Sequence, residues 1–375
     1  MSHVANSFLT DATNEEWNTI SPELRAFKDY SNFMWSFFTD EWLERASDED
    51  FLWYFKRYFN FQGCLVPPST SCRIERSVIN TSQIGLNAQT IELLPGSVNI
   101  IKISDGNLNQ EKTQKKVVLF VHGGGYVFGG ASHAGYLCHV SKALNGTDIL
   151  LVDYTKAPQK QLPFQAYEVL TAYLYALFHW NIPSENIVIM GDSAGGGLAL
   201  LFVQLLSEWK DKTMVISPPK GLVITSPWLD LSVSGPTWQT QRKNDILIKE
   251  LFAKRCARMV TNTSDPKSQK NSAFSPLFGT LEKLPTHIYI LVSTNECLHS
   301  EIRTLINKLQ SVGKDWRFQE HFDVHKSKNT TNELWVVEKK FMPHTWVNFV
   351  GVFPEAQIAL DELAHVVNAW FSNPH

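Results

Sequence analysis

A serine set among glycines, in the run GDSAGGG at residues 191–197, is the residue best placed to do chemistry. It directly follows an apolar run and directly precedes a helical pattern. Glycines in this setting permit the strained strand-to-helix turn that lifts a serine hydroxyl clear of a sheet and places it at a helix N-terminus. The context predicts that Ser193 is a nucleophile. A glycine-rich turn with a capping serine is the structural alternative.

A second glycine-rich segment, HGGGY at residues 122–126, follows another apolar run. A carbonyl attacked by a serine becomes an oxyanion, which needs preorganised N–H donors. We expect the amides of Gly124, Gly125 and Ala194 to supply them, while His122 holds the loop in a structural role. A phosphate-binding loop is the alternative, but neither the G-x-x-x-x-G-K-[ST] nor the G-x-G-x-x-G spacing is present.

Together, the two motifs resemble the GDXG esterases, the hormone-sensitive-lipase-like group of α/β-hydrolases. Three further segments occur in that family's order: YTKAP at residues 154–158, SPWLD at 226–230 and SPL at 275–277. The N-terminal region and the extended late segment look most similar to fungal members, including steryl acetyl hydrolases. The resemblance implies an α/β-hydrolase fold and the hydrolysis of carboxylic esters, usually with short acyl groups.

The acid of a catalytic triad follows the serine along the chain in this fold. The segment STNECLHSE at residues 293–301 stands where the family has G-x-x-D-x-L-x-D-E, which puts Glu296 at the position of the usual aspartate. A glutamate can fill this role because it must only orient the imidazole and stabilise its positive charge. Glu301 is the second candidate, and a solvated acid at a helix start is the alternative interpretation of Glu296.

The histidine of the triad comes last, and the run MPHTW at residues 342–346 matches the family's setting just before the final helix. This resemblance assigns the general base to His344, with His325 as the second candidate. The interval from Glu296 to His344 is longer than is usual in the family. We therefore interpret residues 316–322 as the last strand and residues 324–340 as an insertion.

The rest of the sequence supplies the elements that would position these residues. Apolar, β-rich runs alternate with helical patterns, the runs at residues 116–121, 148–153, 186–190, 221–225 and 287–293, the helices at 135–144, 163–180, 195–209, 301–312 and 354–371. Such alternation predicts a mostly parallel sheet with helices on both faces. The predicted fold class is therefore α/β, with an α/β-hydrolase fold as the resemblance implies.

The first part of the chain differs in composition, because tryptophan and phenylalanine recur there at helical spacing among charged residues. We predict an aromatic-rich helical cap over residues 1–75, a catalytic domain over residues 76–375 and a second cap piece within residues 234–275. The apolar face of the cap would roof a substrate pocket. Ordinary packing onto the core and binding to a membrane surface are the two alternatives.

The composition of the chain narrows the possible functional classes further. A formal net charge of −3 and a pI near 6.5, with no basic block, argue against nucleic-acid binding. The five cysteines are scattered, and their pattern indicates neither a zinc site nor a disulfide framework. With no secretory leader and no apolar run long enough to span a membrane, we expect a soluble, reduced, intracellular and cytoplasmic protein. Peripheral contact with a lipid surface is left open.

The predicted reaction is hydrolysis of a short-chain acyl ester whose alcohol part is large and apolar, with Tyr126 and Trp228 in the substrate pocket. No metal or organic cofactor is required. The same triad could open a lactone, cleave an arylformamide or transfer the acyl group to an alcohol. The alternative that is not an enzyme is a catalytically inactive hydrolase fold that binds a ligand.

Overall fold

The computed structural model describes residues 19–86, 91–106, 115–209, 216–312, 317–319 and 332–372. Its centre is one sheet in the order β1-β2-β4-β3-β5-β6-β7-β9-β8. The strands are β1 (Cys72–Asn80), β2 (Ser97–Asp105), β3 (Val117–Val121), β4 (Asp148–Val152), β5 (Ile187–Asp192), β6 (Gly221–Thr225), β7 (His287–Ser293), β8 (Arg317–Gln319) and β9 (Glu333–Lys339). The β1–β2 and β2–β4 pairs are antiparallel and all other pairs are parallel.

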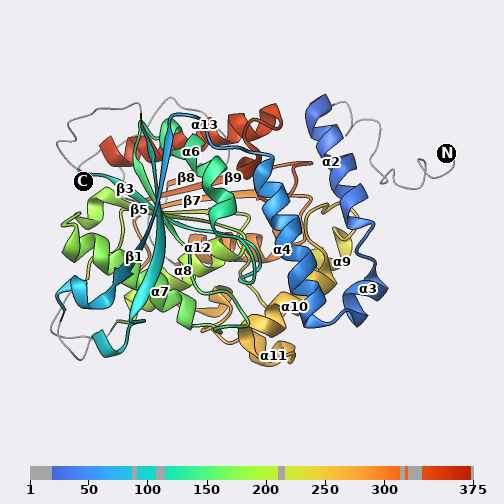
Figure 1. The fold of residues 1–375 in the computed structure, drawn as a ribbon, viewed down its shortest axis with the longest axis horizontal. Coiled ribbons are helices and arrows are strands. Elements are labelled where there is room, and N and C mark those ends of the chain that lie inside the picture. Colours follow the sequence, from blue (N-terminus) through green and yellow to red (C-terminus); the bar gives the residue numbers. More distant parts are fainter. Residues whose placement is uncertain are drawn as a thin grey trace.

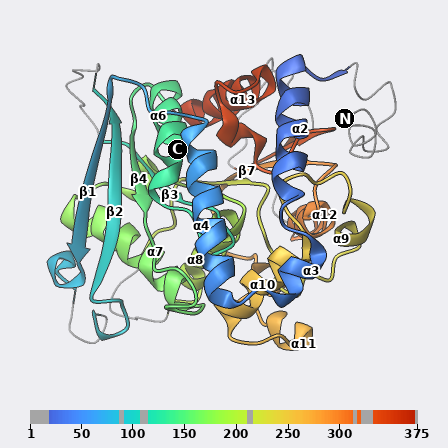
Figure 2. The same cartoon turned by 45° about the vertical axis from the view of Figure 1, so that its right-hand side comes forward.

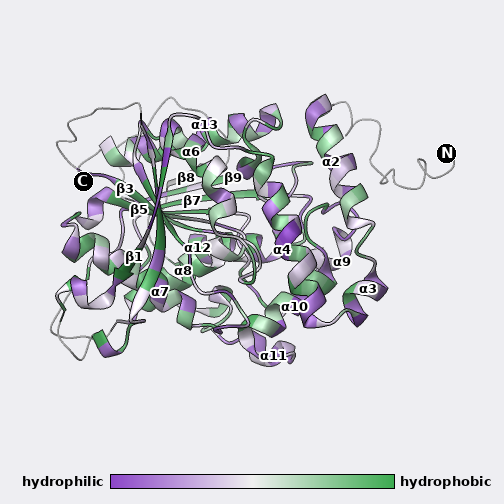
Figure 3. Cartoon of the chain, viewed as in Figure 1, coloured by the Kyte–Doolittle hydropathy of each residue, from purple (hydrophilic) through white to green (hydrophobic). Residues whose placement is uncertain are grey.

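Helices cover both faces of this sheet (Figure 1). They are α6 (Ala134–Ala143), α7 (Phe164–Leu174), α8 (Ala194–Ser207), α12 (His299–Ser311) and α13 (Pro354–Ser372). Successive side chains of a strand point to opposite faces. Accordingly, Val118 and Phe120 of β3 join the apolar cluster under α6 and α13, whereas Leu119 joins the cluster under α7 and α8. The apolar residues concentrate in the strands (Figure 3), and the α/β prediction is confirmed.

The predicted insertion at residues 324–340 is wrong over its second half. Strand β9 lies there and pairs in parallel with β7 along its whole length, from His287↔Glu333 to Ser293↔Lys339. The short β8 pairs with β9 and forms the edge of the sheet. It is not the last strand along the chain, because β9 follows it. The polar start of this segment lies outside the described residues. The second half contains apolar residues because β9 packs beside β7 in the sheet.

Three helices precede the sheet: α2 (Pro22–Trp35), α3 (Asp40–Arg45) and α4 (Asp48–Cys64). Each begins at a residue suited to capping, because the side chains of Ser21, Thr39 and Ser47 accept hydrogen bonds from the first-turn amides. Figure 2 shows α2 and α4 running side by side, with α3 joining their ends. The domain division at residue 75 stays a prediction, and β1 already begins at Cys72.

The second predicted cap piece contains α9 (Thr237–Thr240), α10 (Glu250–Thr261) and α11 (Pro266–Gln269). It contacts the N-terminal helices directly. Asp48 at the start of α4 pairs with Arg255 and Arg258 of α10, at 2.7 and 2.5 Å. Phe55 of α4 lies against Phe252 of α10, with ring centroids 4.7 Å apart. The two pieces therefore form one layer next to the sheet.

A disulfide joins Cys72 on the edge strand β1 to Cys138 on α6. This bond corrects the expectation of a reduced chain, which rested on the scattered cysteine pattern. Pairing across 66 residues of sequence cannot be read from spacing, since only the fold brings β1 and α6 together. Because such bonds persist mainly in oxidising compartments, the cytoplasmic location stays a prediction with this bond against it. No helix in the described ranges is both long and apolar enough to cross a membrane.

Candidate active site

The carboxyl ends of the parallel strands meet at one edge of the sheet, and the predicted site residues follow these ends. Ser193 comes directly after β5, and Glu296 comes shortly after β7. The glycine loop follows β3, and His344 follows β9. In open α/β sheets this edge is where ligands bind. Strand β9 accounts for the long interval between Glu296 and His344. His344 lies in the loop between β9 and the final helix, α13.

The turn at Ser193 is strained, as the motif predicts. Ser193 has φ 52° and ψ −124°, a conformation that is costly for a residue with a side chain. Its amide donates to the carbonyl of Thr225 at 2.9 Å, and its carbonyl accepts from the amide of Trp228 at 2.9 Å. A β-carbon on Gly191 would lie 2.4 Å from the carbonyl oxygen of Gly195, so the turn requires glycine there. Neighbouring backbone thus fixes the serine in its half-buried position at the turn.

The structure brings Ser193, His344 and Glu296 into one hydrogen-bonded line. Nε2 of His344 lies 2.8 Å from Oγ of Ser193, and Nδ1 of His344 lies 2.6 Å from Oε2 of Glu296. Glu296 is completely buried and His344 is 5% exposed. The other carboxylate oxygen of Glu296 accepts from the amide of Ser293 at 2.9 Å. The longer glutamate side chain therefore reaches the imidazole from a backbone that β7 anchors.

Burial and charge act on the pKa of His344 in opposite directions. Burial alone would lower it, because a charged ring loses its hydration. The hydrogen bond to Glu296 and the negative charges of Glu296, Asp245 and Asp192 raise the pKa above its ordinary value overall. The site therefore stabilises an imidazolium, the form that a histidine takes after it accepts a proton from serine.

The loops that carry Glu296 and His344 are tied to each other. Oγ of Ser293 donates to the carbonyl of Met342 at 2.7 Å, and the amide of Phe341 donates to Oδ1 of Asn295 at 2.7 Å. These bonds join the end of β7 and the loop after it to the loop after β9. Such supporting contacts keep the imidazole oriented.

The glycine loop lies beside Ser193 and is held in place by Asp192. The amide of Gly123 donates to Oδ1 of Asp192 at 2.9 Å, and a β-carbon on Gly123 would lie 3.0 Å from Cβ of Ser193. Gly124 has φ 108°, and a β-carbon on it would lie 2.6 Å from the carbonyl oxygen of Phe128. Both Gly124 and Gly125 line the cavity at the serine.

The remaining residues of the two motifs are buried. His122 stacks on Tyr154 with ring centroids 4.1 Å apart, and the Tyr154 hydroxyl donates to the His122 carbonyl at 2.9 Å. Burial and nearby positive charge lower the pKa of His122 well below its ordinary value, which suits a structural residue. Ala194 is the first residue of α8 and is fully buried.

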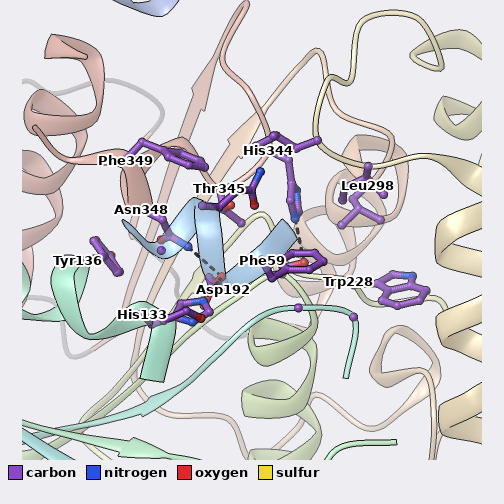
Figure 4. Close-up of a pocket in the computed structure, with 18 of the residues that line it drawn as sticks. Phe59, His133, Tyr136, Asp192, Trp228, Leu298, His344, Thr345, Asn348 and Phe349 are labelled. Atoms are coloured by element: carbon purple, nitrogen blue, oxygen red, sulfur yellow. Dashed lines mark hydrogen bonds and ion pairs between the residues drawn. The ribbon is translucent and has the colours of Figure 1, made fainter. Parts of the chain in front are cut away.

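A cavity of about 940 Å³, its open mouth included, lies over Ser193 and His344 (Figure 4). Trp228 lines it, as predicted. Tyr126 is completely buried with its ring 6.0 Å from that of Trp228, and it is not among the described residues that line the cavity. Both cap pieces contribute to the wall, through Phe59 of α4 and Phe252 of α10.

Several lining residues carried no signal in the sequence. They come from segments far apart in the chain and have ordinary types: Phe59, Gln62, Gly63, Val66, Ser132, His133, Tyr136, Trp238, Leu247, Ile248, Phe252, Ala253, Leu298, Thr345, Asn348 and Phe349. Asp192 belongs to the serine motif, but its contacts across the cavity were not foreseen. Only position could have pointed to His133 and Tyr136, because the segment that follows the glycine loop carries His133 just before α6 and Tyr136 within it.

The second candidates for acid and base are placed differently. Oε1 of Glu301 accepts from the amides of Leu229 and Asp230, at 2.6 and 3.2 Å, so this carboxyl supports the loop after β6. Burial raises the pKa of Glu301 well above its ordinary value. His325 lies outside the described residues. Within the described ranges, no group of three or more histidine, cysteine or acidic side chains could hold a metal ion.

Residues 118–325 match the family model described as the alpha/beta hydrolase fold. An acetyl-hydrolase of Streptomyces hygroscopicus is 30% identical over 250 residues, which cover 66% of this chain and 73% of that protein. An ethyl acetate hydrolase of Pseudomonas putida is 25% identical over 202 residues, 52% of this chain and 60% of that protein. The crystal structure of an esterase from the bacterial hormone-sensitive lipase family aligns with a TM-score of 0.72 at 22% identity, over 94% of this chain and 99% of that one.

The chain belongs to the α/β-hydrolase family, and its relatives include an acetyl-hydrolase and esterases. It is, by class, a carboxylic ester hydrolase. The resemblance inferred from the glycine loop and the serine motif is therefore confirmed, and so is the fold that it implied.

Proposed function

We propose that this enzyme hydrolyses short-chain acyl esters of an apolar alcohol, with Ser193 as nucleophile, His344 as general base and Glu296 as the acid that orients the base. The hydrogen-bonded line from Glu296 through His344 to Ser193, at 2.6 and 2.8 Å, carries this proposal. The names of two relatives, an acetyl-hydrolase and an ethyl acetate hydrolase, support a short acyl group.

In the proposed mechanism, Nε2 of His344 accepts the hydroxyl proton of Ser193 as Oγ attacks the ester carbonyl. The carbonyl oxygen becomes an oxyanion and accepts hydrogen bonds from the amides of Gly124, Gly125 and Ala194. His344 then gives its proton to the departing alcohol. Water, deprotonated by His344, attacks the acyl-enzyme and releases the carboxylic acid and the free serine.

The apolar residues that line the cavity support the proposal that the alcohol part of the substrate is apolar. Trp238, Leu247, Ile248, Phe252 and Leu298 line it together with Trp228. Transfer of an apolar group from water to such a wall releases roughly 25 cal/mol for each Å² that is buried. A large hydrocarbon portion of the substrate would therefore gain binding energy here, while the small acyl group needs little space.

The test is hydrolysis of p-nitrophenyl acetate, butyrate, octanoate and palmitate by the wild type, by Ser193→Ala and by Ser207→Ala. Ser207 lies at the far end of α8, where its hydroxyl donates to the carbonyl of Gln204. We expect turnover of acetate and butyrate that Ser193→Ala lowers by about 10⁴-fold or more, because the nucleophile is lost. Ser207→Ala should keep the wild-type rate.

A fluorophosphonate probe separates an enzyme from a silent binding fold, since only an activated serine forms the covalent adduct. We expect labelling of the wild type and of Ser207→Ala, and none of Ser193→Ala. Folded wild-type protein with neither labelling nor turnover dependent on Ser193 would overturn the proposed mechanism.

A further inference from the structure

One side of the cavity is polar, and the proposed hydrolysis makes no use of its polar groups. His133, Tyr136 and Asn348 lie on the same side of the serine–histidine pair as Asp192 (Figure 4). Nδ2 of Asn348 donates to Oδ2 of Asp192 at 3.0 Å, and Nε2 of His133 lies 3.5 Å from the same oxygen. Asp192 therefore fixes the orientation of both side chains.

Each of the three side chains keeps one buried polar atom without a hydrogen-bond partner: Oη of Tyr136, Nδ1 of His133 and Oδ1 of Asn348. Tyr136 is only 2% exposed, although it lines the cavity. Buried polar groups in folded proteins are paired almost without exception, because an unpaired one loses the hydrogen bond it had with water. Three such atoms, on three residues that line the same side of one cavity, point to a ligand group that pairs them.

The chemistry of the missing group follows from the bonds already made. Asn348 uses its amide nitrogen on Asp192, so the free Oδ1 is an acceptor. His133 presents Nε2 to the same carboxylate, and in the tautomer that carries the proton on Nε2 the other nitrogen, Nδ1, is an acceptor. The Tyr136 hydroxyl is a donor, and burial together with the charge of Asp192 raises its pKa well above the ordinary value. One donor and two acceptors match a hydroxyl group.

We propose that His133, Tyr136 and Asn348 form a subsite for a hydroxyl group of the substrate, so that this enzyme prefers hydroxylated esters to their plain counterparts. The inference rests on the proposed hydrolysis at Ser193. The ligand hydroxyl accepts from Tyr136 and donates to Nδ1 of His133 or Oδ1 of Asn348. It can be carried by the alcohol part or by the acyl part, since the subsite recognises the group and not the chain that bears it.

The test uses two matched pairs of esters, one for each source of the hydroxyl. Butyl acetate is compared with 3-hydroxybutyl acetate, and p-nitrophenyl butyrate with p-nitrophenyl 3-hydroxybutyrate. The readout is the ratio of kcat/KM for the hydroxylated ester to kcat/KM for the plain one. It is measured for the wild type, for Tyr136→Phe and for the control Tyr289→Phe. The Tyr289 hydroxyl is also buried and unpaired, but Tyr289 is not among the described residues that line the cavity.

We expect Tyr136→Phe to lower this ratio about tenfold in one of the two pairs, which is the size of one lost hydrogen bond. Tyr289→Phe should leave both ratios at the wild-type value. The pair that responds identifies the part of the substrate that carries the hydroxyl. Ratios that Tyr136→Phe leaves unchanged in both pairs would overturn the subsite, and would mean that water alone occupies this wall.

A second measurement guards against a variant that folds poorly. Inhibition of p-nitrophenyl acetate hydrolysis by 1,3-butanediol and by 1-butanol gives a ratio of inhibition constants that is independent of the amount of active enzyme. When the hydroxyl lies on the alcohol part, the wild type should bind the diol more tightly, and Tyr136→Phe should lose that preference. Absence of turnover on all four esters by the folded wild type would instead overturn the proposed hydrolysis itself.

Discussion

At the scale of single residues, Glu296, the proposed acid, bears on both the orientation and the pKa of His344. Glu296 makes a 2.6 Å contact to Nδ1 and is fully buried, so its charge acts on the ring without screening by water. The pKa of His344 is therefore raised although burial alone would lower it. A general base must be neutral to accept a proton, so activity is lost as the pH falls through this raised pKa.

We predict that Glu296→Gln lowers kcat for p-nitrophenyl butyrate by about 10³- to 10⁴-fold, because the imidazole loses its orientation and its counter-charge. In the same variant, the acid limb of the pH profile of kcat/KM should move to lower pH, since the negative charge that raises the pKa of His344 is gone. The wild type should show this limb above about pH 6.5, the ordinary pKa of histidine.

Glu301→Gln is the matched control for this prediction. Glu301 is also a buried glutamate, but its Oε1 accepts from the amides of Leu229 and Asp230 and not from His344. Burial raises the pKa of Glu301, and the side-chain amide of glutamine keeps an oxygen that can accept from the same two backbone amides. The acid limb should stay where it is in the wild type. A limb that moves equally in both variants would assign the effect to general electrostatics of the pocket.

The residues that sequence could predict share one property: each lies in a local motif whose geometry requires it. Ser193 needs its glycines for a strained turn, and His344 stands in a short run before the last helix. His133, Tyr136 and Asn348 have no such neighbours. Their roles depend on contacts between α6, the loop after β9 and Asp192, which exist only once the chain has folded. The acid–base line was predictable for this reason, and the shape of the pocket was not.

At the scale of elements, the disulfide connects the edge of the sheet to the helix that forms one wall of the cavity. Cys72 is the first residue of β1, and Cys138 lies on α6, two residues after Tyr136. A cross-link stabilises a protein mainly by restricting its unfolded chain, and more so for longer loops. A disulfide between residues 66 apart in the sequence therefore stabilises the fold more than one that closes a short loop.

We predict that the double variant Cys72→Ser and Cys138→Ser lowers the free energy of unfolding by about 2–4 kcal/mol. Urea unfolding of the wild type and of the variant, each without reductant, gives this difference. The exposed and unpaired Cys64 provides the control, because Cys64→Ser should leave the unfolding midpoint unchanged. Counting free thiols in denatured wild type tests the bond directly: three are expected, and five would show that it does not form.

Strand β9 shows where prediction of elements failed and why. Its segment, ELWVVEK, begins and ends with charged residues and has a short apolar centre. Such a pattern is compatible with a surface insertion. Only its pairing in register with the fully buried β7 makes it a strand of the sheet. The five long apolar runs needed no such context, because strands buried on both faces are apolar throughout.

At the scale of the whole molecule, segments from both ends of the chain meet. The carboxylate of Glu355 on α13 accepts hydrogen bonds from the amide and hydroxyl of Ser21, both at 2.7 Å, which fixes the start of α2. At the other end of this layer, Asp48 pairs with α10. The cap is thereby held at two distant points, and α4 is kept in place over the glycine loop.

Phe59 is the residue through which this arrangement reaches the substrate. It lies on α4, stacks on Phe128 at 5.2 Å between ring centroids, and lines the cavity in front of the serine–histidine pair (Figure 4). The aromatic core of the cap lies next to it and includes Phe51, Phe55 and Phe252. The buried aromatic residues of α2 and α4 therefore serve packing, and among the described aromatic residues of the N-terminal helices Phe59 lines the cavity. A cap that roofs the substrate stays a prediction.

We predict that Phe59→Ala lowers kcat/KM for 1-naphthyl acetate about tenfold relative to ethyl acetate, because a bulky alcohol loses about 1.4 kcal/mol of apolar contact that a small one never makes. Both esters are assayed with each variant, so that differences in leaving-group reactivity cancel in the ratio. Phe33→Ala is the control, since this side chain is 58% exposed on α2 and contacts Phe37. Its ratio should equal that of the wild type. An equal loss on both esters in Phe59→Ala would mean that α4 only supports the glycine loop, and that the cap does not select the alcohol.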